Sequence, residues 1–207
     1  MYLIGLTGGI AAGKTLVANW FRHQRIPVVD ADAVAREVLE SDAALLARVR
    51  ERFGPGVFAE DGSLLRRELG RLVFGDAGAL QELNEMVYPE LARSLDSRLE
   101  ALEDQPLVVL DAALIFEWGI EESCDEIWVV LAPDEQRIDR LLRTRGFSPE
   151  EAHERIASQI PQEDKARRAH RVIENAAGVA ELASRLREEV APLFTGLGLS
   201  LREDSTP

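Results

Sequence analysis

The chain has 207 residues, a length typical of one domain with insertions, and its 46% hydrophobic content is too high for a disordered chain. The single cysteine, Cys124, excludes a disulfide framework and a metal site built from several cysteines. The net charge of −13 repels phosphate on average, so the composition disfavours a binder of nucleic acid or anionic lipid, and any phosphate site must be built locally.

The sequence also gives an expectation about location. No apolar run approaches the roughly 18 residues that a membrane-spanning helix needs. The opening residues, Met1-Tyr2-Leu3-Ile4-Gly5, have neither the basic segment nor the cleavage site of a signal peptide. We therefore expect a cytoplasmic protein without a nucleic-acid or membrane partner, present as a monomer or a weak homo-oligomer.

Short strands and helices alternate at the start of the chain. Residues 1–7 are predicted to form a buried strand, and residues 14–25 a helix with apolar side chains at helical spacing. Residues 26–30 form a second short strand that leads directly into an alanine-rich helix at 31–40. This alternation indicates a parallel sheet with crossover helices.

A long helical tract follows from about residue 42 to residue 103. The tract is broken at Gly54-Pro55-Gly56 and around residues 75–78, and it is inserted between strands of the sheet. Residues 107–111 and 127–131 are continuously apolar, as expected of strands covered on both faces.

The last third of the chain begins with a helix at 134–145, for which we predict an outward-facing row of arginines. A polar, arginine-rich stretch follows, with a helix start at Ser148-Pro149-Glu150-Glu151, and then a short strand at 171–175. A closing helix presents an apolar face, and residues 200–207 are predicted to be a frayed tail. The members of that apolar face are Val179, Leu182, Ala183, Leu186 and Val190.

The turn after the first strand carries the strongest motif. Gly8-Gly9-Ile10-Ala11-Ala12-Gly13-Lys14-Thr15 fits the pattern G-x-x-x-x-G-K-[ST], which arises by chance about once in a hundred chains of this length. Glycines let the backbone N–H groups turn around a phosphate at the start of a helix. Lys14 would reach the β- and γ-phosphates and the Thr15 hydroxyl would bind Mg²⁺. The alternative is a plain glycine turn with a solvated lysine.

Two carboxylates are candidates for the same site. Asp111 ends an apolar strand in the manner of a Walker B residue and is a candidate Mg²⁺ ligand, directly or through water. Asp32 follows the second strand at the sheet edge where ligands bind, so it could accept the proton of an acceptor hydroxyl. The alternative for Asp30 and Asp32 is capping of the following helix.

Many of the basic residues of this acidic chain lie in one segment. In a chain with only two lysines, nine basic side chains lie between residues 137 and 171: Arg137, Arg140, Arg143, Arg145, Arg155, Lys165, Arg167, Arg168 and Arg171. We expect Arg140, Arg143 and Arg145 to close over the nucleotide phosphates as part of a lid that excludes water. For most of the others, the simpler interpretation is a solvated helix face.

Taken together, these features predict an α/β fold with a P-loop NTPase-type parallel sheet flanked by helices. We place the nucleotide-binding core at residues 1–44 with 105–145 and 171–197. A helical insertion occupies 45–104, an arginine-rich lid 146–170 and a tail 198–207.

At this level of detail the chain resembles the dephospho-coenzyme A kinase family, from about Met1 to Leu193. The opening Ile4-Gly5-Leu6-Thr7-Gly8-Gly9-Ile10 is similar to the start of that family. Further matches are Asp30-Ala31-Asp32, Ala35-Arg36, Arg66-Arg67, Leu69, Val73-Phe74, Leu83-Asn84, Pro89, Phe116-Glu117, Gln159, Lys165, Ile173 and Asn175.

This chain departs from the family's usual residues at a few positions. Ala11-Ala12 stands where the family usually has Gly-Ser, and Tyr88 where it usually has His. Ala112-Ala113-Leu114 replaces Pro-Leu-Leu, and Ala169-His170 replaces Ala-Asp. Thr144 takes the place of the usual lid arginine. Leu16 replaces a usual threonine at the α-phosphate.

The resemblance implies phosphorylation of the ribose 3′-hydroxyl of dephospho-CoA by ATP with Mg²⁺. It casts Asp32 as the base and the insertion as the acceptor-binding domain. The catalytic candidates are Asp32, Lys14 and Arg140, and the metal candidates are Thr15 and Asp111. The nucleotide-binding candidates are Gly9, Ile10, Ala11, Ala12, Gly13, Lys14, Thr15, Leu16, Arg143 and Arg145.

Two other functions remain open from the sequence. One is another small-molecule kinase acting on a nucleoside, nucleotide or sugar acid, although Arg66-Arg67 in a long insertion favours a large phosphorylated acceptor. The other is a regulatory ATPase that transfers nothing, which has no need of a base such as Asp32.

Overall fold

The computed structural model describes residues 1–202. The chain folds into two compact units. Residues Met1–Asp30 and the chain from Leu99 onward make up the first unit, and Ala31–Arg98 make up the second. The second unit starts earlier than the predicted insertion at residues 45–104, because the helix after the second strand belongs to it, and it ends a few residues sooner.

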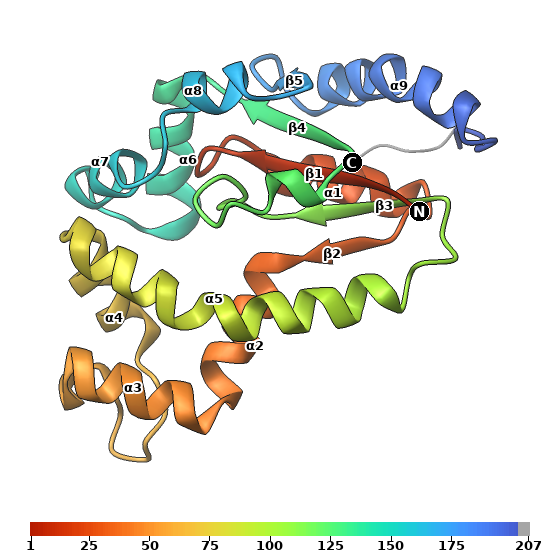
Figure 1. Cartoon of the computed structure of the whole chain (residues 1–207). Helices are drawn as coiled ribbons and strands as arrows, with labels where there is room; N and C mark the ends of the chain where they lie inside the picture. The colour runs from red at the N-terminus through yellow and green to blue at the C-terminus, as the bar shows by residue number, and fades with distance from the viewer. Residues whose placement is uncertain (203–207) are drawn as a thin grey trace. The chain divides into compact units, whose positions relative to one another are not determined.

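Within residues 1–202, the first unit contains a sheet of five parallel strands in the order β2-β3-β1-β4-β5 (Figure 1). The strands are β1 (Tyr2–Gly8), β2 (Val28–Asp30), β3 (Leu107–Asp111), β4 (Glu126–Leu131) and β5 (Arg171–Glu174). The central strand, β1, pairs with β3 on one side and with β4 on the other. The predicted parallel α/β sheet is therefore confirmed, with each strand close to its expected place.

Helices connect these strands, as the alternation in the sequence predicts. They are α1 (Lys14–His23), α6 (Asp134–Arg145), α7 (Pro149–Ala157), α8 (Gln162–Arg167) and α9 (Val179–Gly196), with a short turn, η2 (Glu121–Ser123), before β4. The predicted start at Ser148 is confirmed as a capping box, in which the Ser148 hydroxyl accepts from the Glu151 N–H and the Glu151 carboxylate accepts from the Ser148 N–H.

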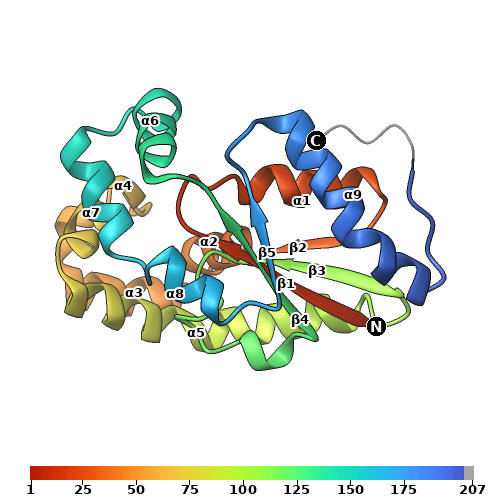
Figure 2. The ribbon, with the colours of Figure 1, turned by 90° about the horizontal axis from the view of Figure 1, so that it is seen from above.

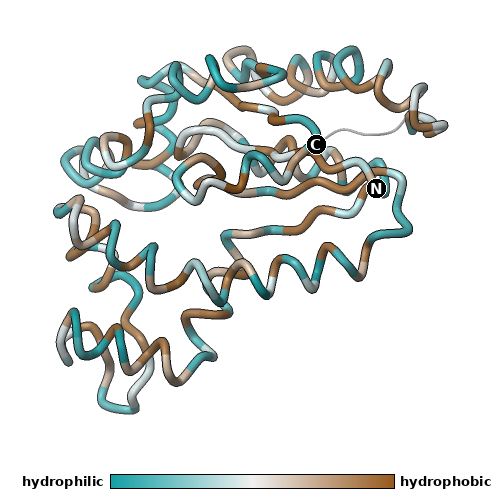
Figure 3. Tube along the Cα trace, in the orientation of Figure 1, coloured by the Kyte–Doolittle hydropathy of each residue, from teal (hydrophilic) through white to brown (hydrophobic). Residues whose placement is uncertain are grey.

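The core of this unit lies between the sheet and the pair of helices α1 and α9, which Figure 2 shows together on one face. Alternate residues of the strands point to that face, among them Ile4, Leu6 and Trp128, all fully buried. Phe21 packs edge-on against Trp128 with ring centroids 5.6 Å apart. The other alternate residues, such as Val108 and Val129, are buried too, so β3 and β4 are apolar along most of their length (Figure 3).

Two details of the C-terminal part differ from the prediction. Val179 is 39% exposed rather than part of the apolar face of α9, because it is the first residue of the helix and lies beyond the buried stripe. Residues 200–202 are not frayed: Leu201 packs against the core, and the Arg202 N–H donates to the Gln24 side-chain oxygen at 2.8 Å. The rest of the predicted tail, 203–207, is outside the described residues.

The second unit is helical, with α2 (Ala31–Ser41), α3 (Ala43–Phe53), η1 (Pro55–Val57), α4 (Arg66–Phe74) and α5 (Ala77–Glu100). Both predicted breaks are confirmed. Helix α3 ends at Phe53, and the next residues are Gly54, whose φ of +82° favours glycine, and Pro55. Helix α4 ends at Phe74, and α5 starts after a short turn. The apolar core of this unit includes Leu45, Val49, Leu69, Val73 and Leu91.

No helix within residues 1–202 combines the length and the apolar character that crossing a membrane requires.

The environment of Cys124 yields a testable prediction. Burial, with smaller contributions from the charges of Asp125 and Glu121, raises the pKa of the Cys124 thiol to about 12. Since the thiolate is the reactive form, only about one thiol in ten thousand is ionised at pH 8. We expect iodoacetamide to alkylate the folded protein slowly at pH 8 and faster as the pH rises toward 12, as followed by intact-protein mass spectrometry. Urea-unfolded protein is the control, and equally fast alkylation of the folded chain would contradict this burial.

Candidate nucleotide-binding site

The motif Gly8–Thr15 forms the turn between β1 and α1 in the first unit. Its backbone takes the left-handed conformation twice, with φ of +60° at Ala11 and +105° at Gly13. Gly13 caps α1 without a side-chain hydrogen bond, so the first N–H groups of the helix are left for a ligand. Alternating conformations of this kind turn successive N–H groups into an anion-binding concavity.

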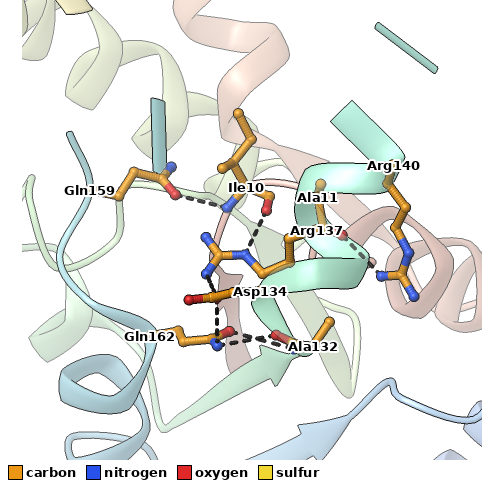
Figure 4. A network of polar contacts seen from close by, with 8 residues as sticks. All are labelled: Ile10, Ala11, Ala132, Asp134, Arg137, Arg140, Gln159 and Gln162. Carbon is orange, nitrogen blue, oxygen red and sulfur yellow. Dashed lines mark hydrogen bonds and ion pairs between the residues drawn. The ribbon is translucent and has the colours of Figure 1, made fainter. Parts of the chain in front are cut away.

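Two arginines of α6 hold the outer side of this loop (Figure 4). The Arg137 Nε donates to the Ile10 carbonyl oxygen at 3.0 Å, and the Arg140 Nη1 donates to the Ala11 carbonyl oxygen at 3.0 Å. A second Arg137 nitrogen, Nη1, pairs with the Asp134 carboxylate at 2.8 Å. Arg137 is only 3% exposed, so the predicted outward arginine row is wrong at this position. The helix presents Arg137 to the loop because the loop carbonyls and Asp134 supply its polar partners.

The other two lid arginines are elsewhere on α6. Arg143 pairs with Asp139 at 2.7 Å and its side chain is 77% exposed, while Arg145 is exposed at the last residue of the helix. Each residue advances about 1.5 Å along the helix axis, which carries positions after Arg140 away from the turn that contacts the loop. Thr144, at the usual place of a lid arginine, donates its hydroxyl to the Arg140 carbonyl oxygen at 2.6 Å.

Lys14 and Asp111 form an ion pair beside the loop. The Lys14 Nζ lies 2.5 Å from the Asp111 Oδ1, and their side chains are 14% and 5% exposed. The sheet brings them together, because β1 and β3 are parallel neighbours with Leu6 opposite Asp111. A nearly buried pair of this kind is costly to break by removal of one partner, since the other charge stays desolvated.

Thr15 and Leu16 occupy the first turn of α1. The Thr15 side chain is exposed, while Leu16 is half-buried and packs against the core of the unit. The Thr15 hydroxyl and the Asp111 carboxylate are hard oxygen donors, the type that Mg²⁺ prefers. Within residues 1–202, no cluster of three or more His, Cys, Asp or Glu side chains could hold a metal by itself. In nucleotide sites Mg²⁺ commonly takes one or two protein ligands and completes its shell with phosphate and water, and the donors present at Thr15 and Asp111 suit that arrangement.

The candidate base, Asp32, belongs to the second unit. It lies in the first turn of α2, which starts directly after β2. The last residue of β2, Asp30, stands opposite Asp111 in the parallel register of the first unit. In the second unit, Arg66 pairs with Glu40 at 2.9 Å, and both side chains are about half exposed.

Three residues beyond α6 also contact the loop or its surroundings. The Gln159 Oε1 accepts from the Ile10 N–H at 2.8 Å, and the Asn175 Nδ2 donates to the Ala12 carbonyl oxygen at 2.8 Å. Lys165 is fully buried, with its Nζ 2.9 Å from the Glu117 carboxylate.

The sequence alone did not assign roles to these residues. Gln159 and Asn175 are matched there only through the family resemblance, and Arg137 only as one of nine basic residues. Lys165 appears in both places. The rarity of lysine singles out Lys165, because a second lysine in such a chain needs a reason. Arg137 and Asn175 carry no such signal, since their partners in the loop are main-chain carbonyls.

His170 has a structural role in this fold. The His170 N–H donates to the Ile127 carbonyl oxygen at 2.8 Å, and the Ile127 N–H donates to the His170 Nδ1 at 2.9 Å. The residue therefore extends the pairing of β4 with the chain leading into β5.

Taken as a whole, the parallel sheet, the loop and the Lys14–Asp111 pair define a P-loop nucleotide-binding protein.

Comparison with known proteins identifies the family. Residues 2–181 match the family model described as dephospho-CoA kinase, and the chain belongs to that family. It is 40% identical over 203 residues to a dephospho-CoA kinase of Anaeromyxobacter dehalogenans, which covers 97% of this chain and 96% of the relative. The family is one of transferases, as the resemblance in the sequence indicates.

Solved structures share this fold. A Thermus thermophilus crystal structure has 38% identity and a TM-score of 0.81, covering 94% of this chain and 98% of the other. The dephospho-CoA kinase of Campylobacter jejuni shares the fold at 22% identity, with a TM-score of 0.69 and coverage of 94% and 98%.

The Lys14–Asp111 pair leads to a prediction about Lys14. Replacing Lys14 by Ala removes the loop cation and leaves Asp111 buried without it, so we expect nucleotide-dependent turnover to fall by about 10²-fold or more. A coupled assay of ADP release measures the loss, and thermal unfolding separates it from instability. Near-normal turnover of a folded variant would contradict the assignment of this loop to nucleotide phosphates.

Proposed function

We propose that this protein transfers the γ-phosphoryl group of ATP to the 3′-hydroxyl of dephospho-CoA, giving coenzyme A in the last step of its synthesis. The observation that carries the proposal is the family match over residues 2–181. The complete motif Gly8–Thr15, at the end of a parallel strand, supports the nucleotide half of the reaction.

The loop and α1 would bind the nucleotide. The N–H groups of the loop and the Lys14 ammonium would hold the phosphates, which compensates locally for the net charge of −13. Arg140, whose guanidinium donates to the Ala11 carbonyl oxygen, would add positive charge close to the transferred group. Arg143 and Arg145 would contact phosphate only if α6 moved, because both are exposed here.

Mg²⁺ would be held by the Thr15 hydroxyl and by Asp111, directly or through water. When bound, the ion neutralises charge on the β- and γ-phosphates. The contribution of the chain is to fix Asp111 at the end of β3, opposite Leu6 in the register of the sheet.

Asp32 would orient the acceptor hydroxyl and accept its proton. The support for this role is its place in the first turn of α2, two residues after the end of β2. In open parallel sheets, ligands bind beyond the carboxyl ends of the strands. A carboxylate at that point is suited to accept a proton as the phosphoryl group is transferred.

The helical segment at 45–104 would bind the acceptor, and residues 146–170 would form the lid. For the acceptor domain, the support is a separate helical unit with its own core, Ala31–Arg98. For the lid, the support is the direct hydrogen bond from the Ile10 N–H to Gln159, which links this segment to the phosphate loop. Exclusion of water by such a segment would suppress hydrolysis of ATP.

The remaining sequence-based predictions concern the setting of the enzyme. Cytoplasmic location, a monomer or weak homo-oligomer, and the lack of nucleic-acid or membrane partners rest on composition: one cysteine and a net charge of −13.

A panel of acceptors tests the proposed reaction. We expect ADP release from Mg·ATP to be stimulated by dephospho-CoA and not by AMP, CMP, adenosine or gluconate, with coenzyme A identified by mass spectrometry. Turnover with another acceptor would point to a different small-molecule kinase. Hydrolysis that is the same with every acceptor and with none would indicate a regulatory ATPase.

A substitution at Asp32 tests the assignment of the base. Replacing Asp32 by Asn keeps the size but removes the proton acceptor, so kcat should fall by about 10²-fold or more while ATP affinity changes little. Calorimetric titration with a non-hydrolysable ATP analogue measures that affinity, and Asp30→Asn is the matched control. Loss of nucleotide binding in the Asp32 variant would assign Asp32 to the metal site instead.

A further inference from the structure

We infer that Arg137 and Asn175 are positioning residues that aim the N–H groups of Ala11 and Gly13 at the phosphates of the bound nucleotide. The inference rests on the nucleotide-binding half of the proposed function. Neither residue belongs to the phosphate-binding motif, and each acts on the loop through a main-chain carbonyl.

The argument starts from the planar peptide bond. In a trans peptide, the carbonyl of one residue and the N–H of the next point in opposite directions. Fixing the Ile10 carbonyl therefore fixes the Ala11 N–H, and fixing the Ala12 carbonyl fixes the Gly13 N–H. Arg137 donates to the Ile10 oxygen at 3.0 Å and Asn175 to the Ala12 oxygen at 2.8 Å. Both donors pull the carbonyls to the outer side of the loop and turn the N–H groups inward.

The two donors are rigid enough to determine the loop. Arg137 is 3% exposed and Asn175 is 2% exposed, so neither side chain exchanges its partner for water. Arg137 is also fixed by its ion pair with Asp134 at 2.8 Å. The main-chain N–H of Asn175 donates to the Leu131 carbonyl oxygen at 2.8 Å, which ties it to the end of β4. The sheet edge and α6 thus set the orientation of two loop peptides.

The glycines of the motif show how closely these side chains approach. A Cβ added at Gly9 would lie 2.6 Å from the Arg137 Nη2, and one at Gly13 would lie 2.1 Å from the Asn175 Nδ2. Both distances are far below van der Waals contact. A side chain at Gly9 or Gly13 would therefore have to displace Arg137 or Asn175 from its place against the loop.

The backbone conformation of Ala11 shows why the loop needs these hydrogen bonds. Ala11 has φ of +60°, a left-handed conformation that is uncommon and unfavourable for a residue with a Cβ. Hydrogen bonds to the carbonyls on either side, from Arg137 to Ile10 and from Arg140 to Ala11 itself, hold the peptide in this conformation. The loop therefore depends on its outer donors to keep a shape that alanine disfavours.

Two variants test the inference, each removing one donor. Asn175→Asp keeps the size and places an acceptor against the Ala12 oxygen. Arg137→Met keeps an unbranched apolar stem, removes the guanidinium and leaves Asp134, which is largely exposed, to water. We expect each to weaken Mg·ADP binding about tenfold, the loss of one well-aimed hydrogen bond, with the KM for dephospho-CoA changed less than about twofold. Matched controls are Asn19→Asp on α1 and Arg185→Met on α9, which are expected to bind Mg·ADP like the original protein.

Amide chemical shifts provide a readout that a general loss of stability would not reproduce. On titration with Mg·ADP, the Ala11 and Gly13 N–H signals should both move in the original protein. In Asn175→Asp, the shift change of the Gly13 N–H on titration should shrink, while that of the Ala11 N–H persists. In Arg137→Met, the shift change of the Ala11 N–H should shrink, while that of the Gly13 N–H persists. Equal responses of both amides in both folded variants, or unchanged ADP affinity, would overturn the inference. If Asn175→Asp does not fold, Arg137→Met and its Ala11 signal decide alone.

The experiment separates this inference from the proposed function. Mg·ADP binding is measured without an acceptor, so the result does not depend on the identity of the acceptor. Failure of the original protein to bind Mg·ADP would contradict the proposed function itself. Normal binding by the original protein and by both variants would contradict only the roles of Arg137 and Asn175.

Discussion

The parallel pairing of β1 between β3 and β4 is the constraint on which the rest of the site depends. It places the carboxyl ends of three buried strands at one edge of the sheet. From that edge β1 leads into the phosphate loop, β3 ends in Asp111, and β4 leads to the helix that carries Arg137. Close packing of side chains on both faces keeps this register, because a slip by one residue would move every side chain to the other face, where its neighbours differ in size and shape.

The phosphate loop connects the carboxyl end of β1 to α1 and contacts residues of α6 and of the chain after β5. Its inner side offers N–H groups, and its outer carbonyls accept from Arg137, Arg140 and Asn175. An acidic protein thereby concentrates positive groups at one turn, although its average field opposes phosphate. The Ile10 N–H donates to Gln159, which connects the loop to the segment between α7 and α8.

Much of this architecture can be predicted from the sequence because its signals are local. Continuous apolar runs give β3 and β4, the Gly54-Pro55 step ends α3, and Ser148 starts α7. The motif Gly8–Thr15 gives both the turn and its chemistry. These features depend on neighbours in the chain, so a single sequence carries them.

The parts that were missed depend on contacts between distant residues. Arg137 looks like one more arginine of a solvated helix, and only the fold places the Ile10 carbonyl within its reach, 127 residues away in the chain. Val179 fits the apolar spacing of α9 but lies at the end of the helix, where the core no longer covers it. Periodicity identifies a face of a helix, but it does not show where along the helix the burial stops.

The central claim is that the γ-phosphoryl group of ATP is transferred to the 3′-hydroxyl of dephospho-CoA. The most direct test is to label that phosphoryl group and to find its position in the product. The protein would be incubated with dephospho-CoA and ATP carrying ³²P at the γ-position, and the labelled product digested with a 3′-specific nucleotidase. The account predicts that all of the label in the acceptor is released as phosphate. Label that resists this enzyme, or ATP consumption without any label in the acceptor, would contradict it.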